Sequence, residues 1–321
     1  MPLTHDASDN MHLTHFVSVI IPVYNDAPRL RLCLDAIAHQ TYGADDAERD
    51  AYEVIVVDNA SDPDQGIPAL VGEYPFAVYV FEPAPGAYTA RNRGLTVAKG
   101  DVLAFTDADC IPAADWLEKG VGHLAQIEHC GLVAGKVKIF FRGQKGNAVE
   151  LYESVTAFPQ RQLLAQYQGA ATANVFTFKA VMDAVGPFNT ALRSHGDLEW
   201  GHRVYLAGYA QFLADDTCVA HPARYTFDQL RTRTLRLAGG AFGRAMEEAR
   251  PNNAFVRHSA FARLLVGDLL PPVNFALSSL KDDRLHGWRE KLTVVLVLCW
   301  VRYHSALEKV RLRLGHEPER S

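Results

Sequence analysis

Four short, β-branched apolar runs constrain the fold of this chain more than any other feature. The runs are Phe16–Ile21, Glu53–Val57, Ala77–Phe81 and Val102–Thr106. Continuous apolar runs of this length are typical of strands buried on both faces of a sheet. Helical spacing occurs between them, as at Leu30, Leu34 and Ile37. This alternation of strand and helix predicts an α/β fold with a mostly parallel central sheet.

The composition excludes several classes of protein. Apolar residues make up 48% of the 321 residues, which is enough to build a buried core. The net charge of −5 argues against binding of nucleic acid by the whole chain. None of the five cysteines forms a CxxC pair, so neither a zinc site nor a disulfide framework is indicated.

No segment of the sequence predicts export or a membrane span. Residues 1–15 are polar and lack the apolar stretch of a signal peptide, and we expect them to be disordered. The longest strongly apolar run, Leu292–Val301, has ten residues, whereas a transmembrane helix needs about 20. We therefore expect a cytoplasmic protein without a transmembrane helix.

Charge divides the chain into two regions. Residues 1–223 carry 15 Lys and Arg against 27 Asp and Glu, and residues 224–321 carry 17 against 10. The second region consists of helical stretches interrupted by Pro251, Pro271-Pro272 and the charged cluster Lys281–Arg284. We expect an α/β domain over 16–223 and a helical C-terminal extension, read as three stretches, over 224–321.

The loops after the strands lack the common nucleotide-binding motifs. No GxGxxG follows the first strand and no GxxxxGK[ST] is present, which argues against a dehydrogenase or a P-loop enzyme. Polar segments follow the four strands instead: Pro22–Asn25, Asp58–Asp62, Pro85–Gly94 and Thr106–Cys110.

In order and spacing, these segments resemble the family-2 glycosyltransferases, which have the Rossmann-like GT-A fold. The resemblance continues through Gly186–Asn189 and Gly196–Arg203 and covers about residues 16–223. It implies transfer of a sugar, with inversion, from a nucleoside-diphosphate sugar to an acceptor hydroxyl. A UDP-sugar is the expected donor. The expected acceptor is a glycan or a lipid-linked molecule in bacterial polysaccharide or glycoconjugate synthesis.

The DxD sequence Asp107–Asp109 is the candidate metal site. Its two carboxylates flank one residue at a strand end, so both can reach one hard cation such as Mn²⁺ or Mg²⁺. The resemblance implies that Asp109 makes the more direct metal contact, whereas Asp107 faces both nucleotide and metal. It also suggests His221 as a third ligand, although a structural role for this histidine remains open.

Five further residues are candidates for nucleotide-sugar binding. Asp58 can accept hydrogen bonds from a base or ribose, or can close an Asx turn. Pro22 and Tyr24 resemble the wall of a base pocket, with a buried core role as the alternative for Tyr24. Arg91 suits a phosphate group, or is an exposed helix cation. Asn92 either contacts the ribose or supports the DxD loop.

Asp197 is the candidate catalytic base, a role that the resemblance implies for an Asp at this helix start. The family pattern has Glu before this Asp, whereas this chain has Gly196. Glu199 is therefore a competitor. Two residues along a helix span about 200°, so the two carboxylates cannot face one sugar. Glu199 and Arg203 are four residues apart and can pair along the helix.

Two other functions fit parts of the sequence. A nucleotidyltransferase shares the architecture but would need a basic, Gly-rich loop after the first strand, where Pro22–Asn25 stands. A non-catalytic nucleotide-sugar-binding protein fits if Gly196 marks an inactive site. The C-terminal helices combine apolar and Arg-rich faces, which suits peripheral contact with the inner face of the cell membrane or formation of a homodimer.

Overall fold

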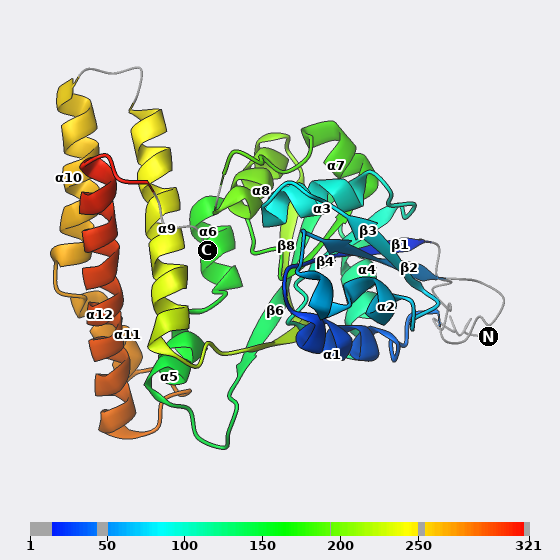
Figure 1. The fold of residues 1–321 in the computed structure, drawn as a ribbon, viewed down its shortest axis with the longest axis horizontal. Coiled ribbons are helices and arrows are strands. Elements are labelled where there is room, and N and C mark those ends of the chain that lie inside the picture. Colours follow the sequence, from blue (N-terminus) through cyan, green and yellow to red (C-terminus); the bar gives the residue numbers. More distant parts are fainter. Residues whose placement is uncertain (1–14, 44–50, 193, 250–253, 318–321) are drawn as a thin grey trace, which may run out of the picture. The chain divides into compact units, whose positions relative to one another are not determined.

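The structure is a computed structural model that describes residues 15–43, 51–192, 194–249 and 254–317 (Figure 1). Residues 1–14 of the segment expected to be disordered lie outside these ranges. The predicted α/β fold with C-terminal helices is confirmed.

A mixed sheet forms the centre of the α/β part. Within the described residues its order is β3-β2-β1-β4-β7-β6-β8-β5. The strands are β1 Val17–Val23, β2 Tyr52–Asp58, β3 Ala77–Phe81, β4 Val102–Thr106, β5 Ile111–Pro112, β6 Cys130–Phe140, β7 Asn174–Phe178 and β8 Ala210–Pro222. Strand β1 pairs in parallel with β2 and β4, and β2 pairs in parallel with β3. Strand β7 runs antiparallel to both β4 and β6.

The parallel strands place several candidate residues at one edge of the sheet. Val23 at the end of β1 lies opposite Asp58 at the end of β2, and Asp58 lies opposite Phe81 at the end of β3. Strand β4 is buried throughout and ends at Thr106, immediately before the DxD sequence. The loops that follow these strands therefore begin at a common edge, where open α/β sheets bind ligands.

Helices pack around the sheet through apolar faces. They are α1 Ala27–Ile37, α2 Ile67–Val71, α3 Ala87–Leu95, α4 Trp116–Gln126 and α7 Lys179–Val185. Helix α1 buries Leu30, Cys33, Leu34 and Ile37, whose spacing marks a single helix face. Helix α3 contacts β1 and β2. A Cβ atom on Gly94 would lie 2.7 Å from Ile20, so glycine permits this close approach.

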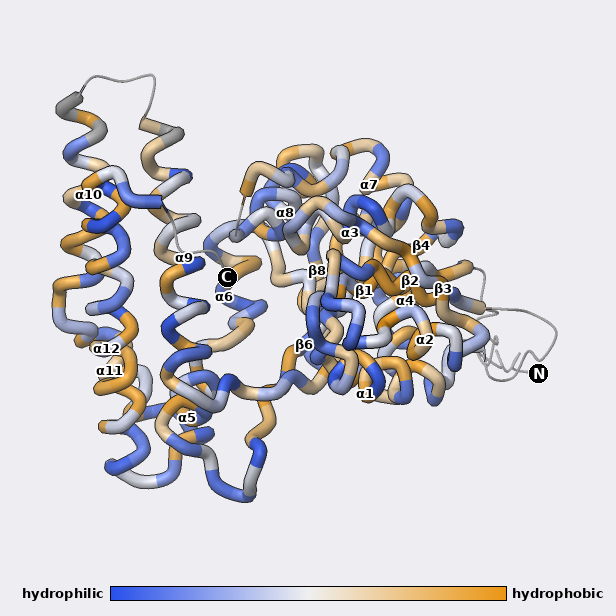
Figure 2. The backbone as a smooth tube through the Cα atoms, viewed as in Figure 1, coloured by the Kyte–Doolittle hydropathy of each residue, from blue (hydrophilic) through white to orange (hydrophobic). Residues whose placement is uncertain are grey.

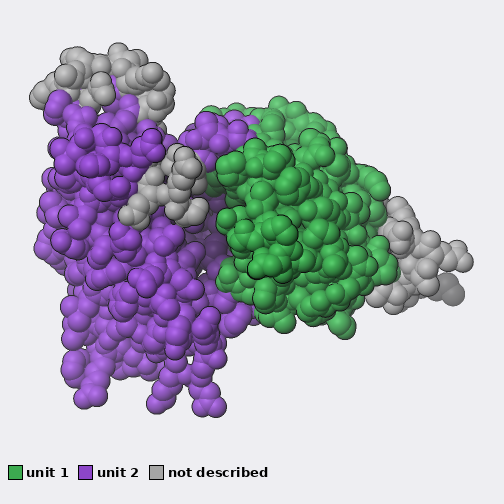
Figure 3. All heavy atoms as spheres, viewed as in Figure 1, with its two compact units in different colours: residues 1–136, 172–187, 204–218 green, residues 137–171, 188–203, 219–321 purple. Residues whose placement is uncertain are grey.

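The chain divides into two compact units (Figure 3). Unit 1 comprises residues 1–136, 172–187 and 204–218, and unit 2 comprises residues 137–171, 188–203 and 219–321. The domain boundary expected at residue 223 remains a prediction from sequence. Unit 1 holds the strand ends and the DxD sequence, whereas unit 2 holds Asp197 and the long C-terminal helices.

Unit 2 has an apolar core of its own. Its elements include α5 Ala148–Thr156, α6 Gln160–Tyr167, α9 Phe227–Glu248, α10 Ala254–Leu269, α11 Val273–Leu280, α12 Gly287–Arg313, and the first residues of α8 Gly196–Leu206. Helix α12 packs against α5, α9, α10 and α11. Buried residues from α5, α9, α12 and the segment before α12 form one cluster: Val149, Leu151, Tyr152, Leu230, Leu285, Val294 and Val297.

Local sequence signals set several helix ends in unit 2. Asn147 and Glu150 form a reciprocal capping box at the start of α5. The helix expected over Asn147–Gln166 is interrupted, because Phe158 has a positive φ of 47° and Pro159 precedes α6. Within the described part of residues 224–321 there are four helices, α9 to α12, where the sequence predicted three stretches. The predicted breaks at Pro271-Pro272 and Lys281–Arg284 fall between α10 and α11 and between α11 and α12.

The C-terminal helices expose many apolar side chains. Figure 2 shows hydrophobic stretches along α10, α11 and α12. The stretch His258–Leu280 is long and apolar enough to cross a membrane, by length and composition, and none of its window is buried. This finding differs from the sequence expectation, which rested on uninterrupted apolar runs and therefore passed over a stretch containing Arg263 and Asp268.

Candidate active site

The end of β1 carries an exposed aromatic ring. Pro22 is the sixth residue of β1 and lies opposite Val57. Tyr24 follows the strand and is 61% exposed, which excludes the alternative of a buried core tyrosine. The ring is therefore available to contact a flat ligand, as the prediction of a base-pocket wall requires.

Asp58 is a buried carboxylate at the end of β2. Its Oδ1 accepts a hydrogen bond from the Ser61 backbone N–H at 2.9 Å, and its Oδ2 accepts one from the Tyr79 hydroxyl at 3.0 Å. Burial, with this hydrogen bond to Asp58, raises the pKa of Tyr79 to about 12, so the phenol remains a donor. The contact with Ser61 closes the turn, and the remaining carboxylate lone pairs leave the predicted role in binding a base or ribose open.

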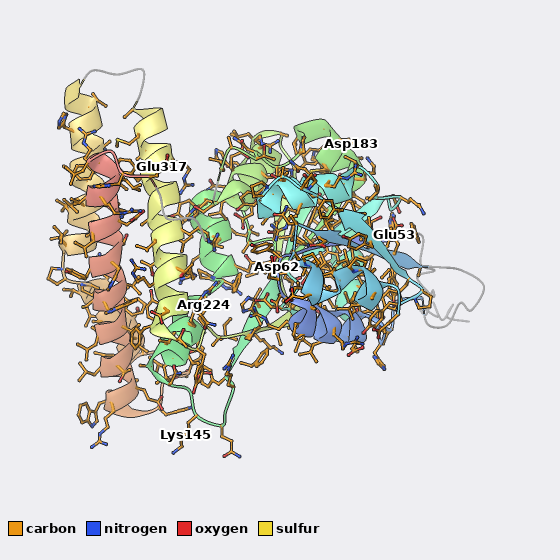
Figure 4. All side chains as sticks on the ribbon, viewed as in Figure 1. Glu53, Asp62, Lys145, Asp183, Arg224 and Glu317 are labelled. Atoms are coloured by element: carbon orange, nitrogen blue, oxygen red, sulfur yellow. The ribbon has the colours of Figure 1, made fainter. Side chains whose placement is uncertain are left out.

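Two asparagines hold the loops at this edge, and the sequence did not assign them this role. The Asn25 amide bonds to the Asp62 carboxylate at 2.9 Å, and its oxygen accepts the Asp62 backbone N–H at 2.7 Å; Figure 4 labels Asp62. The Asn59 amide donates to the carbonyls of Glu82 and Ala84 at 3.0 and 2.7 Å. An Asn directly after a β-branched run was the available sequence signal, because Asn bonds readily to nearby backbone.

Arg91 of α3 pairs with the first carboxylate of the DxD sequence. Its Nη2 donates to Asp107 Oδ1 at 2.5 Å, and the Arg91 side chain is only 5% exposed. The alternative of an exposed helix cation is therefore wrong. Arg91 Nε is buried without a hydrogen-bond partner among the described residues. Arg91 therefore orients the Asp107 carboxylate, and through it can affect a ligand bound at this edge.

Asp107 and Asp109 fit a hard divalent cation. Their oxygens and the Cys110 sulfur all lie within 4.8 Å of one another. Burial raises the pKa of the Cys110 thiol well above its usual range, and the thiol bonds to the Ala173 carbonyl. A neutral thiol is a poor ligand, whereas two carboxylates suit Mg²⁺ or Mn²⁺. Arg29 Nη1 lies 3.4 Å from Asp109 and partly balances the charge of this pair.

Asn92 lies one residue beyond Arg91 in α3, partly exposed. Tyr88, on the same helix, places its ring 5.9 Å from the Arg91 guanidinium carbon. The predicted roles of Asn92, at the ribose or in support of the DxD loop, both remain predictions.

Unit 2 contains the two carboxylates that compete for the role of base. Asp197 lies in the first turn of α8, and its Oδ1 accepts a hydrogen bond from the Leu198 backbone N–H at 3.0 Å. Glu199 receives hydrogen bonds from Arg203 Nε at 2.8 Å and Nη2 at 3.2 Å. The predicted pairing of Glu199 with Arg203 is confirmed, and it occupies Glu199 along the helix.

His221 is a buried histidine near the end of β8. Its Nδ1 bonds to the Pro222 carbonyl at 2.7 Å, and its ring packs 4.7 Å from the ring of Phe158. Because Nδ1 donates this hydrogen bond, Nε2 is the ring nitrogen that would bind a metal, as in many metal-binding histidines. The metal role of His221 stays a prediction.

His195 stands at a strained position directly before α8. It has a positive φ of 62°, and its Nδ1 lies 3.0 Å from the Ser194 hydroxyl. Burial lowers the pKa of His195 to about 4. The positive charges of Arg244, Arg236 and Arg233 add to this effect, and the negative charge of Asp197 opposes it. His195 is therefore a neutral imidazole near pH 7.

Comparison with known proteins decides the family. The sequence model described as Glycosyl transferase family 2 matches residues 18–185. Glycosyltransferase AglE from Haloferax volcanii is 34% identical over 89% of this chain and 91% of its own length. This chain belongs to glycosyl transferase family 2. Like the other members, it is a glycosyltransferase, which sets aside the nucleotidyltransferase and the non-catalytic binding protein.

Two further relatives bear on this glycosyltransferase. The pre-mycofactocin glycosyltransferase of Mycobacterium tuberculosis is 29% identical over 69% of this chain and 45% of its own length. The mannosyltransferase PcManGT from Pyrobaculum calidifontis, solved in complex with GDP-Man and Mn²⁺, has a TM-score of 0.59. It is 19% identical and the match covers 94% of this chain and 88% of that one. This likeness confirms the predicted GT-A fold.

The low pKa of His195 predicts a loss of stability in acid. The unfolded chain takes up a proton on this histidine near pH 6.5, whereas the folded chain does so only near pH 4. The free energy of unfolding therefore falls as the pH drops from 6.5 to 4. We expect His195→Asn to remove about 3 kcal/mol of this dependence, since Asn tolerates the positive φ. Urea unfolding across this pH range measures the effect.

His129→Asn is the matched control, because His129 also has a positive φ, 55°, but is exposed. Equal pH dependence in His195→Asn and wild type would contradict the assignment.

Proposed function

We propose that this glycosyltransferase moves a sugar from a nucleoside-diphosphate sugar to an acceptor hydroxyl with inversion, in polysaccharide or glycoconjugate synthesis. The observation that carries the proposal is the DxD carboxylate pair at the end of β4, held by Arg91. The expected donor is a UDP-sugar, and the GDP-Man in the complex of PcManGT adds GDP-sugars to those worth testing. Pro22, Tyr24, Asp58 and Asn92 are the proposed contacts to the nucleotide.

Asp107 and Asp109 of unit 1 are the residues that would hold a divalent cation, Mn²⁺ or Mg²⁺. His221, which belongs to unit 2, stays a further ligand predicted from the sequence alone. When bound, such an ion neutralises negative charge on the diphosphate leaving group. Arg91 holds the Asp107 carboxylate in one orientation through their ion pair. Arg29 is 51% exposed and also pairs with Asp26, so a cation at Asp109 could replace its contact there.

The proposed metal role predicts the effect of Asp109→Asn. This change removes one ligand charge at a partly exposed position, so we expect the fold to remain. Transfer should fall by about 100-fold or more, because metal-assisted charge stabilisation contributes several kcal/mol. The measurement is transfer or slow hydrolysis of UDP- and GDP-sugars with Mn²⁺ and with a chelator.

Asp64→Asn, an exposed acid in the same unit, is the control. Full activity of Asp109→Asn, or of wild type in excess chelator, would overturn the metal proposal.

Asp197 is the proposed base that takes the proton from the acceptor hydroxyl. We expect Asp197→Asn to lower kcat by about 10²–10⁴-fold, the usual contribution of a general base. Glu199→Gln should cost only a few tenths of a kcal/mol in stability, since it removes a helix-surface pair. Steady-state rates and donor binding of both variants measure the difference. A dead Glu199→Gln variant with an active Asp197→Asn would reverse the assignment.

We further propose that α10–α12 bring the enzyme to an anionic membrane surface, where a lipid-linked acceptor would lie. Large apolar side chains are exposed on these helices, including Leu269, Val273, Leu277, Leu280, Trp288, Leu292 and Leu296. Arg289 lies 5.7 Å from the Trp288 ring, and Lys291 follows in the same turn. Apolar side chains beside cations suit the interface of anionic lipids.

Co-sedimentation with lipid vesicles tests this surface. We expect wild type to bind anionic vesicles more tightly than neutral ones. The double variant Leu277→Glu and Leu296→Glu should bind at least tenfold more weakly, because two charges enter an exposed apolar surface. Leu32→Glu, 52% exposed in unit 1, is the control and should bind as wild type does. Absence of wild type from both vesicle types, with self-association in ultracentrifugation, would favour a homodimer instead.

A further inference from the structure

One face of α9 concentrates arginines. At 100° per residue, Arg233, Gly240 and Arg244 lie within about 20° of one line along the helix, and Arg236 lies about 60° away. A Cβ atom on Gly240 would lie only 1.8 Å from Ser194 Oγ, so this face of α9 rests against the segment that leads into α8. The glycine allows the helix to approach that segment, and the arginines flank the contact.

Glu153 of α5 contacts Arg233 on this face of α9. Glu153 is fully buried and serves two guanidinium groups, that of Arg224 at 2.7 Å and that of Arg233 at 3.6 Å; Figure 4 labels Arg224. Arg244 Nε is buried without a hydrogen-bond partner within the described residues. Burial lowers the pKa of Arg233, and the negative charge of Glu153 opposes this effect. A buried donor without a partner is costly unless a ligand satisfies it.

We propose that Arg233, Arg236 and Arg244 bind a phosphate or diphosphate group carried by the acceptor. Guanidinium groups bind phosphate oxygens in pairs, and partial burial strengthens these bonds. Neutral His195 supplies a further polar contact without adding charge. The proposal rests on the proposed function, and it names the acceptor class as phosphate-linked.

We assign the phosphate site to the acceptor because the arginines lie in unit 2, as does the proposed base Asp197. Asp197, the proposed base, and the arginines belong to the same unit, and both act electrostatically on His195. The DxD carboxylates, proposed to serve the donor, belong to unit 1. An acceptor whose hydroxyl meets Asp197 can therefore place its phosphate on the arginines of α9.

Binding measurements without turnover test the site. The probes for the proposed phosphate site are inorganic diphosphate and hexyl phosphate, and hexanol is the uncharged control. Binding of UDP and GDP with Mn²⁺ is measured separately and reports on the donor site. We expect Arg244→Gln and Arg236→Gln each to weaken binding of hexyl phosphate and diphosphate about tenfold, with binding of UDP and GDP unchanged. Arg231→Gln, about 200° round the same helix from Arg233, is the matched control and should bind as wild type does.

Two results would overturn the proposal. Equal weakening of UDP or GDP binding would assign the arginines to the donor diphosphate. Unchanged binding of hexyl phosphate, or equal binding of hexanol, would remove the site. Arg236 is exposed, so Arg236→Gln should fold even if Arg244→Gln does not. Because no sugar is transferred in these measurements, failure of the proposed reaction would appear separately, in the Asp109 and Asp197 variants.

Discussion

The ion pair between Arg91 and Asp107 is the interaction on which the geometry of the DxD edge depends. Arg91 is almost fully buried, and a buried guanidinium needs a negative partner. Asp107 supplies it from the loop after β4, so α3 and that loop are fixed to each other. The Asp107 carboxylate is thereby held close to that of Asp109. A cation bound there would find a charged pair of ligands already oriented.

The loops that follow β1, β2 and β3 are held by side-chain hydrogen bonds to polar groups that the strand ends leave unpaired. Asn25 joins the loop after β1 to Asp62 in the loop after β2, and Asn59 joins the latter to the segment after β3. Asp58 closes its own turn through Ser61. These bonds use amide and carboxylate groups of short side chains, which leave the backbone little freedom. Tyr24 is left exposed beside them.

Unit 2 handles charge differently. There the positive charges of Arg233, Arg236 and Arg244 on α9 act on His195, which stays neutral near pH 7. Glycine at 240 brings this charged face against the start of α8, which carries Asp197. A cationic surface beside a proposed base is an arrangement that favours an anionic acceptor. The exposed apolar side chains of α10–α12 are consistent with an acceptor that has a lipid part.

The sequence by itself determined the α/β class, the family and the strand-end positions of the candidate residues. It could do so because β-branched runs, their order and the DxD spacing are local properties of the chain. The pairing of Glu199 with Arg203 was likewise predictable from helix geometry. Tertiary structure alone decided that Tyr24 is exposed, that Arg91 is buried against Asp107, and that Asn25 and Asn59 tie loops together. It also decided that positive charges on α9 act on His195, because burial and charge pairing depend on residues distant in sequence.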